Sequence, residues 1–464
     1  MYILALEERM NPQIFREYDI RGLVDKDLTE PVVEKVGRGL GTVVRRDGGR
    51  WIVVGRDCRE SSTRFRQALC AGITSTGLSV MDIGIVPTPA TYFAAHTLPV
   101  DGLAMITGSH NPPEYNGLKI GRGRATLHGS EIQELRKLIE RGDFERAPAG
   151  RVTELDIVTA YIHFIRQTVS VGRKGMKIVV DAGNGTAGVV AVPLFRAMGF
   201  EVVPLFCEMD ATFPNHHPDP TVPENLEELI RAVTTEKAEV GLAYDGDADR
   251  LGAVDEKGNI LWGDQLMILF ARSVLKEVPG AAIVGEVKCS FTLYDEIEAR
   301  GGRPIMWKTG HSLIKAKMKE EGAELAGEMS GHIFFRNRYF GFDDGIYSSA
   351  RLLEILSHEK RKLSELLLDV PPTFSTPELR VETVEDKKFE IVRRATEALR
   401  RQGLRIIDVD GVRVTFPDGW GLIRASNTQP LLVLRFEAKT RERLEEIRKL
   451  IEATLEAVKR EVNA

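Results

Sequence analysis

Three aspartates at alternate positions form the strongest chemical pattern in this sequence. Asp245, Asp247 and Asp249 directly follow an apolar run. Three crowded carboxylates repel one another unless a cation neutralises them, and hard oxygen ligands suit Mg²⁺ or Ca²⁺. The next residue, Arg250, would suit a phosphate that bridges the arginine and the metal. An EF-hand does not fit, because Arg250 stands at the sixth position, where that loop requires glycine. The sequence therefore predicts a divalent-metal site.

A hydroxyl follows another apolar run, in the segment Thr107-Gly-Ser-His-Asn-Pro112. The run from Leu103 to Ile106 leads into this segment, and a second run leaves it through Leu118 and Ile120. This pattern predicts a strand–loop–strand, with Ser109 on an exposed loop that buried sheet holds at both ends. We expect Ser109 to carry a phosphoryl group. An ordinary turn is the alternative for this loop by itself, since Ser, Asn, Gly and Pro favour turns for local backbone reasons.

The aspartate loop allows a second interpretation. An Asp-x-Asp after a strand also begins the site of aspartyl-phosphate phosphatases and mutases, in which the first Asp is the nucleophile. Asp245 would then carry the phosphate in place of Ser109. The two bonds differ chemically, because a serine phosphoester survives acid whereas hydroxylamine cleaves an acyl phosphate.

Two further polar loops carry groups that can bind a ligand. Gly327-Glu-Met-Ser-Gly-His332 offers a carboxylate and a hydroxyl that can read sugar hydroxyls, and a histidine that can transfer protons near neutral pH. Arg424-Ala-Ser-Asn-Thr428 would form a nest for an oxyanion, with Arg435 on the next strand. Alternatively, the histidine is structural and the arginine loop is an exposed turn. Tyr18-Asp-Ile-Arg-Gly22 is a weaker candidate that could deliver Arg21 to an anion.

One glycine-rich segment favours a different function. Gly183-Asn-Gly-Thr-Ala-Gly188 matches the dinucleotide-binding fingerprint, with Glu208 and Asp210 about 20 residues further on. An oxidoreductase is therefore an alternative. We discount it, because the segment lies within a repeated unit whose other two copies lack these glycines.

The elements that must position these loops repeat three times. Each unit has a strand, a turn, a helix, a glycine and a second strand, over residues 51–84, 177–206 and 281–309. These are βαβ units, and a left-handed glycine ends each helix at little cost. After each unit, another apolar run leads into the serine, aspartate or sugar-reading loop. Since ligands bind at strand ends in open α/β sheets, three such loops could build one shared site.

The pattern changes at about residue 368, where prolines mark a linker. Closely spaced strands and two helices follow, which predicts an antiparallel α+β domain. We therefore expect an α/β fold of three similar mixed α/β domains plus a smaller C-terminal α+β domain. The domains would span residues 1–151 with the phosphoserine loop, 152–253 with the metal loop, 254–367 with the sugar-binding loop and 368–464 with the phosphate-binding loop.

Composition limits the class of protein. The chain has 464 residues, of which 43% are hydrophobic and 28% charged, as in globular proteins with an ample core. A net charge of −5 does not support a nucleic-acid surface. Neither a membrane span nor a targeting segment is evident. The four cysteines lack metal-binding spacing and are typical of free thiols in a reducing compartment. We expect a cytoplasmic protein with no nucleic-acid or membrane partner.

Together, these segments resemble the α-D-phosphohexomutase family, from Phe15 to Ala438. The Gly-Glu-Met-Ser-Gly-His and Thr-Gly-Ser-His-Asn-Pro forms are similar to the phosphomannomutase/phosphoglucomutase branch. Phosphoglucosamine mutases more often read Ser-Ala-Ser-His-Asn-Pro and Glu-Gln-Ser-Gly-His. The first 14 residues have no assigned role. Five motifs occur in the order of the family: Tyr18 to Gly22, Thr107 to Pro112, Asp245 to Arg250, Gly327 to His332 and Arg424 to Thr428.

The resemblance implies a deep central cleft between the domains and a role for each residue that lines it. Ser109 would be the phosphoserine, and one of its phosphate oxygens would complete a site for one Mg²⁺ per chain on the three aspartates. Glu328 and Ser330 would hold the sugar 3- and 4-hydroxyls, with His311 and Lys288 beside them.

The resemblance also implies groups that act on protons and phosphate. Lys119 and His332 are the candidate proton-transfer groups, and His110 and Arg250 would belong to the catalytic set. The remaining residues would contact phosphate: Tyr18 and Arg21 at the phosphoserine, and Arg424, Ser426, Asn427, Thr428 and Arg435 at the phosphate that does not react.

The implied reaction interconverts hexose 1-phosphate and hexose 6-phosphate through a hexose 1,6-bisphosphate, which is also the activator. Phospho-Ser109 would donate its phosphoryl group, the bisphosphate would turn round, and its other phosphate would return to Ser109. One phosphate nest that serves both orientations barely reads C2, so mannose and glucose phosphates should both be accepted. A phosphoglucosamine mutase of the same family and a non-catalytic sugar-phosphate sensor remain alternatives. We expect a monomer or weak homo-oligomer whose partners are small hexose phosphates.

Overall fold

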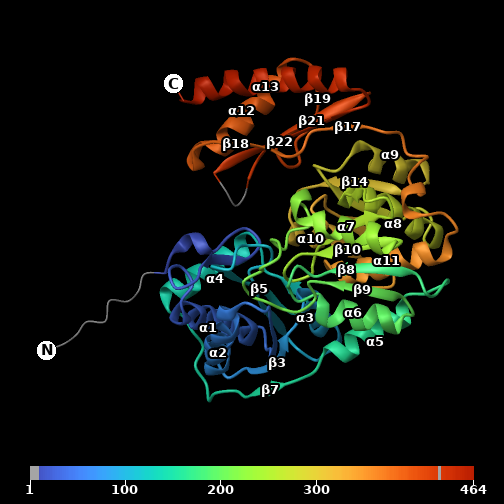
Figure 1. Ribbon diagram of the computed structural model, residues 1–464. Helices are drawn as coiled ribbons and strands as arrows, with labels where there is room; N and C mark the ends of the chain where they lie inside the picture. Colours follow the sequence, from blue (N-terminus) through green and yellow to red (C-terminus); the bar gives the residue numbers. More distant parts are fainter. Residues whose placement is uncertain (1–9, 427–429, 464) are drawn as a thin grey trace. The chain divides into compact units, whose positions relative to one another are not determined.

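The chain folds into two compact units, which are described separately below. Figure 1 shows a computed structural model, which describes residues 10–426 and 430–463. Unit 1 contains Met1–Ile260 and Phe342–His358, and unit 2 contains Leu261–Gly341 and Glu359–Ala464. One segment late in the chain, Phe342–His358, therefore belongs to the unit formed by the first half.

The first sheet of unit 1 has the strand order β1-β5-β4-β2-β3-β7, and β6 pairs with β5. Helices α1 and α2 pack against each other, and α3 contacts β2 and β4 (Figure 1). Residues such as Val36, Phe65 and Ile52 form a buried core between the helices and the sheet. The elements are β1 (Ile20–Leu23), α1 (Glu30–Arg46), β2 (Trp51–Arg56), α2 (Glu60–Ser75), β3 (Ser79–Ile85), α3 (Thr88–Thr97), β4 (Gly102–Ile106), β5 (Tyr115–Arg122), β6 (Ala125–Thr126), α4 (Ser130–Arg141) and β7 (Val152–Glu154).

The second sheet has the order β12-β11-β10-β8-β9. Helix α11, from the late segment of unit 1, packs against β11 and α6. Its fully buried side chains, including Ile346, Tyr347 and Leu353, explain why this segment stays with unit 1. The elements are α5 (Val158–Thr168), β8 (Lys177–Asp181), α6 (Gly188–Ala197), β9 (Glu201–Leu205), α7 (Glu227–Glu236), β10 (Val240–Tyr244), β11 (Leu251–Asp255), β12 (Ile260–Leu261) and α11 (Gly345–His358).

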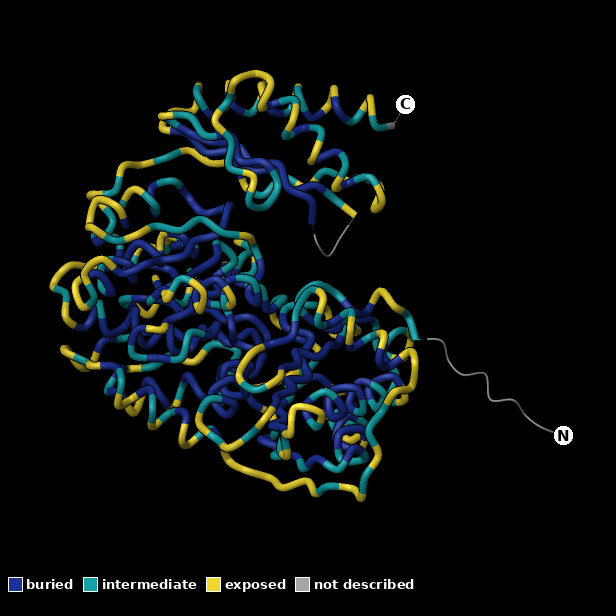
Figure 2. Tube along the Cα trace, turned by 180° about the vertical axis from the view of Figure 1, so that it is seen from behind, coloured by how far each residue is buried: buried dark blue, intermediate teal, exposed yellow. Residues whose placement is uncertain are grey.

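The third sheet, in unit 2, has the order β14-β13-β15-β16. Helix α10 contacts β13 and β15, while α9 contacts β14. Strands β13, β15 and β16 are buried along their whole length, whereas β14 is mostly half-buried. Figure 2 shows exposed residues gathered on the outside of the tube. The elements are α8 (Gly263–Glu277), β13 (Ala282–Glu286), α9 (Phe291–Ala299), β14 (Arg303–Trp307), α10 (His311–Glu321), β15 (Leu325–Gly327) and β16 (Ile333–Phe335).

The three sheets share one local arrangement that creates the polar loops. In each sheet, one strand runs parallel to the first strand of the βαβ unit and antiparallel to the strand that follows it in the chain. The parallel pairs are β4 with β2, β10 with β8, and β15 with β13. The antiparallel pairs are β4 with β5, β10 with β11, and β15 with β16. The serine, aspartate and sugar-reading loops join these antiparallel pairs. The predicted threefold repetition is thus confirmed, and each polar loop occupies the equivalent place in its sheet.

Glycines end the helices of the three repeats, as the sequence predicts. Gly77, Gly199 and Gly301 have φ angles of 88°, 94° and 75°, which are left-handed values that residues with a Cβ rarely adopt. Each glycine lies two residues beyond the last residue of its helix, so the chain can turn directly into the next strand.

The C-terminal sheet of unit 2 is antiparallel, with the order β17-β22-β21-β20-β19, and β18 also pairs with β22. Helices α12 and α13 pack on it, and the buried face of α13 includes Ile447, Ile451 and Leu455. This confirms the predicted α+β domain. The elements are β17 (Phe374–Ser375), β18 (Leu379–Glu382), α12 (Lys388–Arg401), β19 (Arg405–Ile407), β20 (Val412–Phe416), β21 (Gly419–Ala425), β22 (Leu431–Ala438) and α13 (Arg441–Asn463). Across the described residues of both units, the 3₁₀ turns are Pro12–Ile14, Pro223–Leu226, Leu363–Glu365 and Glu385–Lys387.

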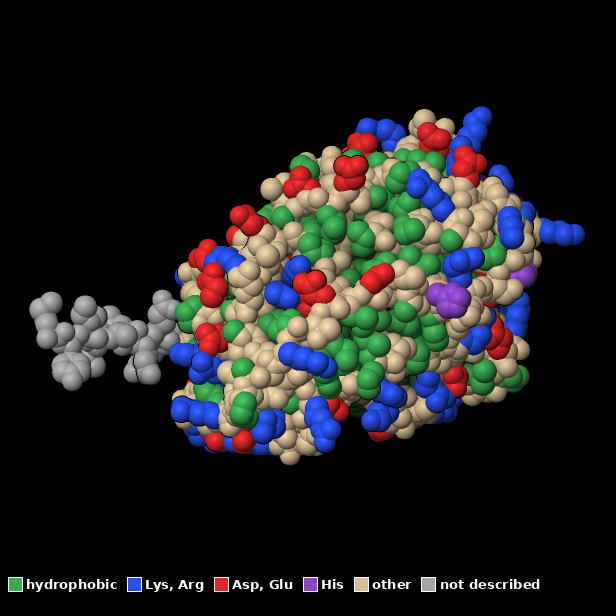
Figure 3. Space-filling model, turned by 90° about the horizontal axis from the view of Figure 1, so that it is seen from below, with side chains coloured by type: hydrophobic (Ala, Val, Ile, Leu, Met, Phe, Trp, Pro, Cys, Tyr) green, Lys and Arg blue, Asp and Glu red, His purple; other side chains and the backbone are tan. Residues whose placement is uncertain are grey.

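The surface carries charges of both signs. On the face in Figure 3, Lys and Arg side chains are interspersed with Asp and Glu rather than gathered into one basic patch. Within the described residues, no helix combines the length and the apolarity needed to cross a bilayer.

The glycine-rich turn after β8 packs against the aspartate loop. The Thr186 backbone N–H donates to the Gly246 carbonyl at 3.0 Å, and a Cβ on Gly185 would lie 2.5 Å from that oxygen. The glycines that match the dinucleotide fingerprint therefore allow two backbones to approach closely. His216 stabilises the same turn, because its Nε2 lies 3.1 Å from a carboxylate oxygen of Asp181, the last residue of β8.

The surroundings of His216 favour the imidazolium form. Its Nδ1 faces the His217 carbonyl oxygen at 3.0 Å and its Nε2 faces Asp181, so both ring nitrogens face acceptors. Burial is the largest single influence and opposes the charged form, but the hydrogen bond and the charge of Asp181, together with the His217 carbonyl, outweigh it and raise the pKa of His216. A raised pKa in the folded state stabilises the protein below the unfolded pKa of about 6.5, and this contribution is lost as pH rises through the folded value.

We predict that His216→Gln lowers the midpoint of thermal unfolding most at about pH 5.5, where it removes about 1–3 kcal/mol of stability. The difference from the parent protein should shrink towards about pH 9, because His216 is then neutral in both states. Thermal melts at several pH values provide the measurement. The exposed His163 serves as the control, so His163→Gln should change little at any pH. A loss of thermal stability in His216→Gln that does not vary with pH would contradict a stabilising ion pair between His216 and Asp181.

Candidate active site

The three aspartates lie in the loop between β10 and β11. Asp245, Asp247 and Asp249 are each fully buried, and one carboxylate oxygen from each lies within 4.8 Å of the others. Ala248 has a left-handed φ of 58°, which bends the chain between the last two aspartates. A single short loop thus gathers three carboxylates where water cannot screen them.

Ser109 meets this loop from the neighbouring sheet. Its Oγ donates a hydrogen bond to Asp245 Oδ2 at 2.8 Å. The predicted exposed position of Ser109 is wrong, since only 3% of the residue is accessible to solvent. The aspartate loop itself covers the serine loop, because a Cβ on Gly246 would lie 2.5 Å from the Ser109 carbonyl oxygen. Glycine at this position therefore lets the two loops touch.

Lys119, on β5, supplies positive charge to the aspartates. Its Nζ donates to Asp247 Oδ2 at 2.8 Å and also to Asp249. Burial disfavours the ammonium, but Asp247 and Asp249 together raise the pKa of Lys119 well above its usual value. Thr88, the first residue of α3, donates from Oγ1 to Asp247 Oδ2 at 2.5 Å and from its backbone N–H to the Asp247 carbonyl at 2.9 Å. Thr88 was not predicted from the sequence.

The electrostatics of the loop fit a divalent cation. Burial first, and then Asp249 and Asp247, raise the pKa of Asp245 well above its usual value, while Arg250 Nε lies 3.8 Å from its carboxylate. Asp247 Oδ1 is buried and accepts no hydrogen bond from any described residue. Unscreened carboxylates with a spare oxygen are the donor set that hard divalent ions prefer. The residues present can therefore hold a metal ion.

Other predicted residues of unit 1 lie around the serine loop. His110 Nδ1 is 3.1 Å from Ser109 Oγ. Arg21, on β1, donates to Asn111 Oδ1 at 3.1 Å and to Asp19 at 2.6 Å. Tyr18 is half-buried just before β1. The structure thus brings Arg21 and His110 to the loop that carries the serine.

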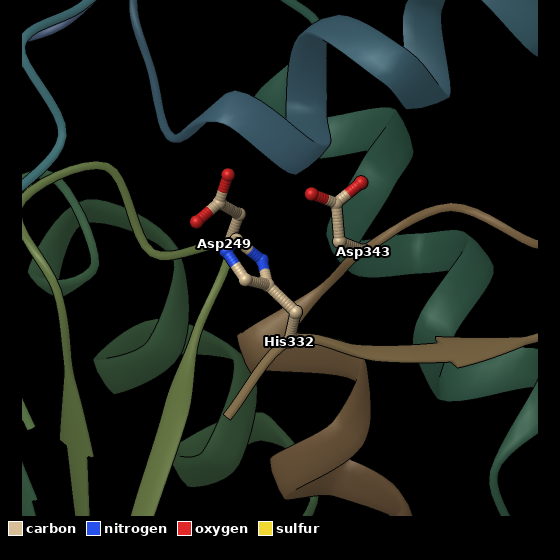
Figure 4. Close-up of side chains that lie close together, drawn as sticks. All are labelled: Asp249, His332 and Asp343. Carbon is tan, nitrogen blue, oxygen red and sulfur yellow. The ribbon is translucent and has the colours of Figure 1, made fainter. Parts of the chain in front are cut away.

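An additional acidic residue lies near the aspartates and was not predicted. Asp343, just before α11, is fully buried, and one of its carboxylate oxygens lies within 4.8 Å of one from Asp249. Figure 4 shows the side chains of Asp249 and Asp343. In the sequence, the pair Asp343-Asp344 ahead of an apolar helix was the feature that could have indicated this residue. The second aspartate of the pair has a structural role, because Asp344 accepts a hydrogen bond from the Tyr161 hydroxyl at 2.6 Å.

Within unit 2, buried Glu286 at the end of β13 connects three loops. It accepts a hydrogen bond from the Met329 backbone N–H at 3.1 Å and another from the Thr309 hydroxyl. Lys288 Nζ lies 3.5 Å from its carboxylate and donates to Glu378 at 2.6 Å. Burial raises the pKa of Glu286, whereas Lys288 opposes that rise. Glu286 has no motif around it, so the sequence did not indicate it.

The sugar-reading loop is fixed by these contacts. Glu328, after β15, accepts from the Gly310 backbone N–H at 2.5 Å, and Ser330 is half-buried in the same loop. His311 begins α10, and its ring stacks on that of His332, with 5.5 Å between the ring centroids. The structure therefore brings Glu328, His311 and His332 together.

The C-terminal sheet holds its predicted arginines on neighbouring strands. Arg424, on β21, donates from Nε to Asp410 Oδ2 at 3.1 Å, and the same carboxylate oxygen accepts the Thr309 backbone N–H at 3.0 Å. Arg435, on β22, donates to the Lys288 carbonyl at 2.8 Å. Ser426 is buried directly after β21. Asn427 and Thr428 lie outside the described residues.

Family models cover nearly the whole chain. Those for the phosphoglucomutase/phosphomannomutase α/β/α domains I, II and III match residues 12–146, 159–258 and 262–374. The C-terminal domain model of the same family matches residues 378–454. The chain belongs to the phosphoglucomutase/phosphomannomutase family. It is therefore an enzyme, an intramolecular phosphotransferase of the isomerase class.

Individual relatives agree with this membership. A phosphomannomutase/phosphoglucomutase of Pseudomonas aeruginosa is 50% identical over 449 residues, 96% of each chain. A phosphoglucomutase of Neisseria gonorrhoeae is 48% identical over 447 residues, 96% of this chain and 97% of its own. A crystal structure of a phosphoglucomutase/phosphomannomutase family protein from Burkholderia thailandensis superimposes with a TM-score of 0.93 at 44% identity, covering 97% of this chain and 98% of that one. The predicted family is thus confirmed.

We predict that Glu286→Ala raises KM for glucose 1-phosphate about tenfold, with a smaller effect on kcat. The reason is that the Met329 N–H and the Lys288 ammonium lose a buried acceptor, which releases the sugar-reading loop. Steady-state kinetics measure the effect, and circular dichroism checks the fold. Glu320→Ala is the matched control, because the Glu320 side chain is 65% exposed and pairs only with Lys317 on its own helix among the described residues. Parental KM in Glu286→Ala would contradict this role.

Proposed function

We propose that this enzyme interconverts the 1-phosphates and 6-phosphates of mannose and glucose through a phosphoserine at position 109. The observation that carries the proposal is the 2.8 Å hydrogen bond from Ser109 Oγ to Asp245, within a group of three buried carboxylates. A buried hydroxyl next to a cation site is the arrangement that phosphoryl transfer needs, because positioning and charge neutralisation dominate that reaction.

In the first half-reaction, the free hydroxyl of the hexose phosphate attacks the phosphorus of phospho-Ser109. A new phosphorus–oxygen bond forms to the sugar as the bond to Ser109 Oγ breaks. The sugar hydroxyl loses its proton, and Ser109 Oγ gains one. His110, 3.1 Å from Oγ, is placed to return that proton. The product is a hexose 1,6-bisphosphate.

In the second half-reaction, the bisphosphate has turned round and Ser109 Oγ attacks its other phosphate. The bond from that phosphorus to the sugar oxygen breaks, Ser109 Oγ loses its proton and the sugar oxygen gains one, so the phosphoenzyme is restored and the isomeric monophosphate leaves. Lys119 and His332 are the proposed proton-transfer groups on the sugar side. Added hexose 1,6-bisphosphate would act as an activator, because it rephosphorylates any Ser109 that has lost its phosphate.

The metal ion we propose is Mg²⁺. Asp245, Asp247, Asp249 and a phosphoserine oxygen would hold it, and the spare Oδ1 of Asp247 supports this assignment. When bound, it would withdraw charge from the phosphoryl oxygens. Arg250, 3.8 Å from Asp245, would add positive charge on the protein side.

The sugar and its second phosphate would be held by residues of unit 2. We propose that Glu328 and Ser330 bind the 3- and 4-hydroxyls, with Lys288 and His311 beside them. Arg424, Ser426, Asn427, Thr428 and Arg435 would bind the phosphate that does not react, in either orientation of the sugar. Such a site would not distinguish the configuration at C2, which is why we propose that both mannose and glucose phosphates are substrates. The double name of the Pseudomonas aeruginosa relative supports this breadth.

We predict that Ser109→Ala lowers kcat by at least about 10³-fold while divalent-metal binding persists, since the carboxylates remain. Turnover and Mn²⁺ binding provide the measurements. Intact-mass analysis of the parent enzyme should find one phosphate that survives acid and resists hydroxylamine. Loss of that phosphate to hydroxylamine would instead identify an aspartyl phosphate, and near-parental turnover of Ser109→Ala would reject the covalent mechanism.

We predict that mannose 1-phosphate and glucose 1-phosphate react with kcat/KM values within about tenfold of each other, because the site does not read C2. Glucosamine 1-phosphate should react at least about 100-fold more slowly, because the site ignores only the configuration of the C2 hydroxyl, whereas the amine of glucosamine places at C2 a charged ammonium that is costly to desolvate. The comparison is made side by side with Mg²⁺ and the matching 1,6-bisphosphate. A preference for the glucosamine compound would favour the phosphoglucosamine mutase alternative, and no turnover of any sugar would favour a sensor.

A further inference from the structure

The side chain of Arg59, the residue just before α2, is bonded to Asp57 and to backbone carbonyls of the segment that carries Ser109. Its side chain is 1% exposed. All five guanidinium N–H groups have acceptors. Nε donates to Asp57 Oδ2 at 3.1 Å, and the other four N–H groups donate to the carbonyls of Pro112 at 2.7 Å, Tyr115 at 3.1 Å, Ser109 at 2.9 Å and Asn111 at 2.5 Å.

Asp57, directly after β2, also bonds the serine loop. Its Oδ2 accepts the Gly108 backbone N–H at 3.0 Å, and its Oδ1 accepts the Ser62 hydroxyl at 2.5 Å. The Arg59 backbone N–H also donates to Oδ1, at 3.0 Å. The buried Asp57–Arg59 pair, which we call the loop clamp, therefore bonds both the donors and the acceptors of the serine loop.

The clamp leaves the loop little freedom to rearrange. A Cβ on Gly108 would lie 2.4 Å from Arg59 Nε, so the backbone and the guanidinium are already in contact. The ring of Phe213 covers the guanidinium, whose central carbon lies 5.1 Å from the ring centroid. Ser109 has a φ of 49°, a left-handed value that costs a non-glycine residue free energy unless its surroundings enforce it. The Thr107 hydroxyl accepts the Ser109 N–H at 2.8 Å and so supports the same conformation.

We propose that Arg59 is a positioning residue: it keeps the serine loop in one conformation through both half-reactions and contacts neither the sugar phosphate nor the phosphoryl group. This rests on the proposed function of Ser109. The physical reason is that an arginine binds phosphate with two parallel N–H groups, and every N–H of Arg59 is already bonded within the protein. Lysine cannot replace it, because one ammonium has three donors and no planar fork.

The test compares Arg59→Lys with Arg66→Lys. Arg66 lies on helix α2, which begins directly after Arg59. Its Nε donates to Asp82 at 2.6 Å, so it is an ion-paired arginine whose partner lies outside the serine loop. Each protein is phosphorylated with glucose 1,6-bisphosphate, and intact-mass analysis gives the fraction phosphorylated. Rapid mixing with glucose 6-phosphate then measures the single-turnover rate of phosphoryl transfer per phosphorylated serine, and steady-state assays give kcat and KM.

For Arg59→Lys we expect the transfer rate and kcat to fall about 100-fold in both directions, with KM changed less than about threefold. Arg66→Lys should keep the parental rate even if its thermal midpoint falls, because a merely structural change alters how much protein is folded but not the rate per phosphorylated serine. Asp57→Asn keeps the shape of the side chain but removes the charge paired with Arg59, so its transfer rate and kcat should fall by a smaller factor. This variant replaces Arg59→Lys in the test if Arg59→Lys does not fold.

Parental transfer rates in Arg59→Lys, or in Asp57→Asn where that variant serves, would overturn the clamp. A rise in KM for the sugar phosphate with an unchanged transfer rate would also overturn it, because it would identify Arg59 as a phosphate ligand. These outcomes leave the proposed function intact when the parent enzyme carries phosphate and transfers it. A parent enzyme that carries no phosphate on Ser109 would overturn both proposals.

Discussion

Burying three carboxylates side by side is the constraint on which unit 1 depends. Asp245, Asp247 and Asp249 are taken out of water, and their mutual repulsion grows as the dielectric falls. Lys119 and Thr88 compensate for part of this cost, and both come from the neighbouring sheet and its helix. The packing of the first sheet against the second is therefore tied to the chemistry of the loop, because a shift between them would leave buried charge without a partner.

Two different solutions hold the equivalent loops of the repeated fold. The serine loop is held by an arginine and an aspartate that bond its backbone directly, with Ser109 in a left-handed conformation. The sugar-reading loop is held by one carboxylate, Glu286, that bonds three loops and is balanced by Lys288. The strand arrangement is the same in both sheets, so the fold supplies the place of a loop and local side chains supply its rigidity.

Glycines contribute to the site through close approach of backbones. Gly246 lets the aspartate loop touch the serine loop, and Gly185 lets the turn after β8 touch Gly246. This contact gives a physical reason for the segment that matched the dinucleotide fingerprint. A spacing of glycines reports that a backbone must pass close to something, whereas only the fold shows whether the neighbour is a ligand or another part of the chain.

The sequence by itself determined the family, the threefold βαβ repetition, the antiparallel C-terminal domain and the loops at the strand ends. These follow from local order: apolar periodicity, helix-ending glycines and short motifs whose residues are neighbours in the chain. Only the tertiary structure showed that Ser109 is buried, that Asp343 lies beside Asp249, that α11 packs with unit 1, and that Arg59 and Glu286 hold the loops. The reason is physical, because burial, charge pairing and a side chain that bonds distant backbone depend on which segments meet in space, and no spacing along the chain records that.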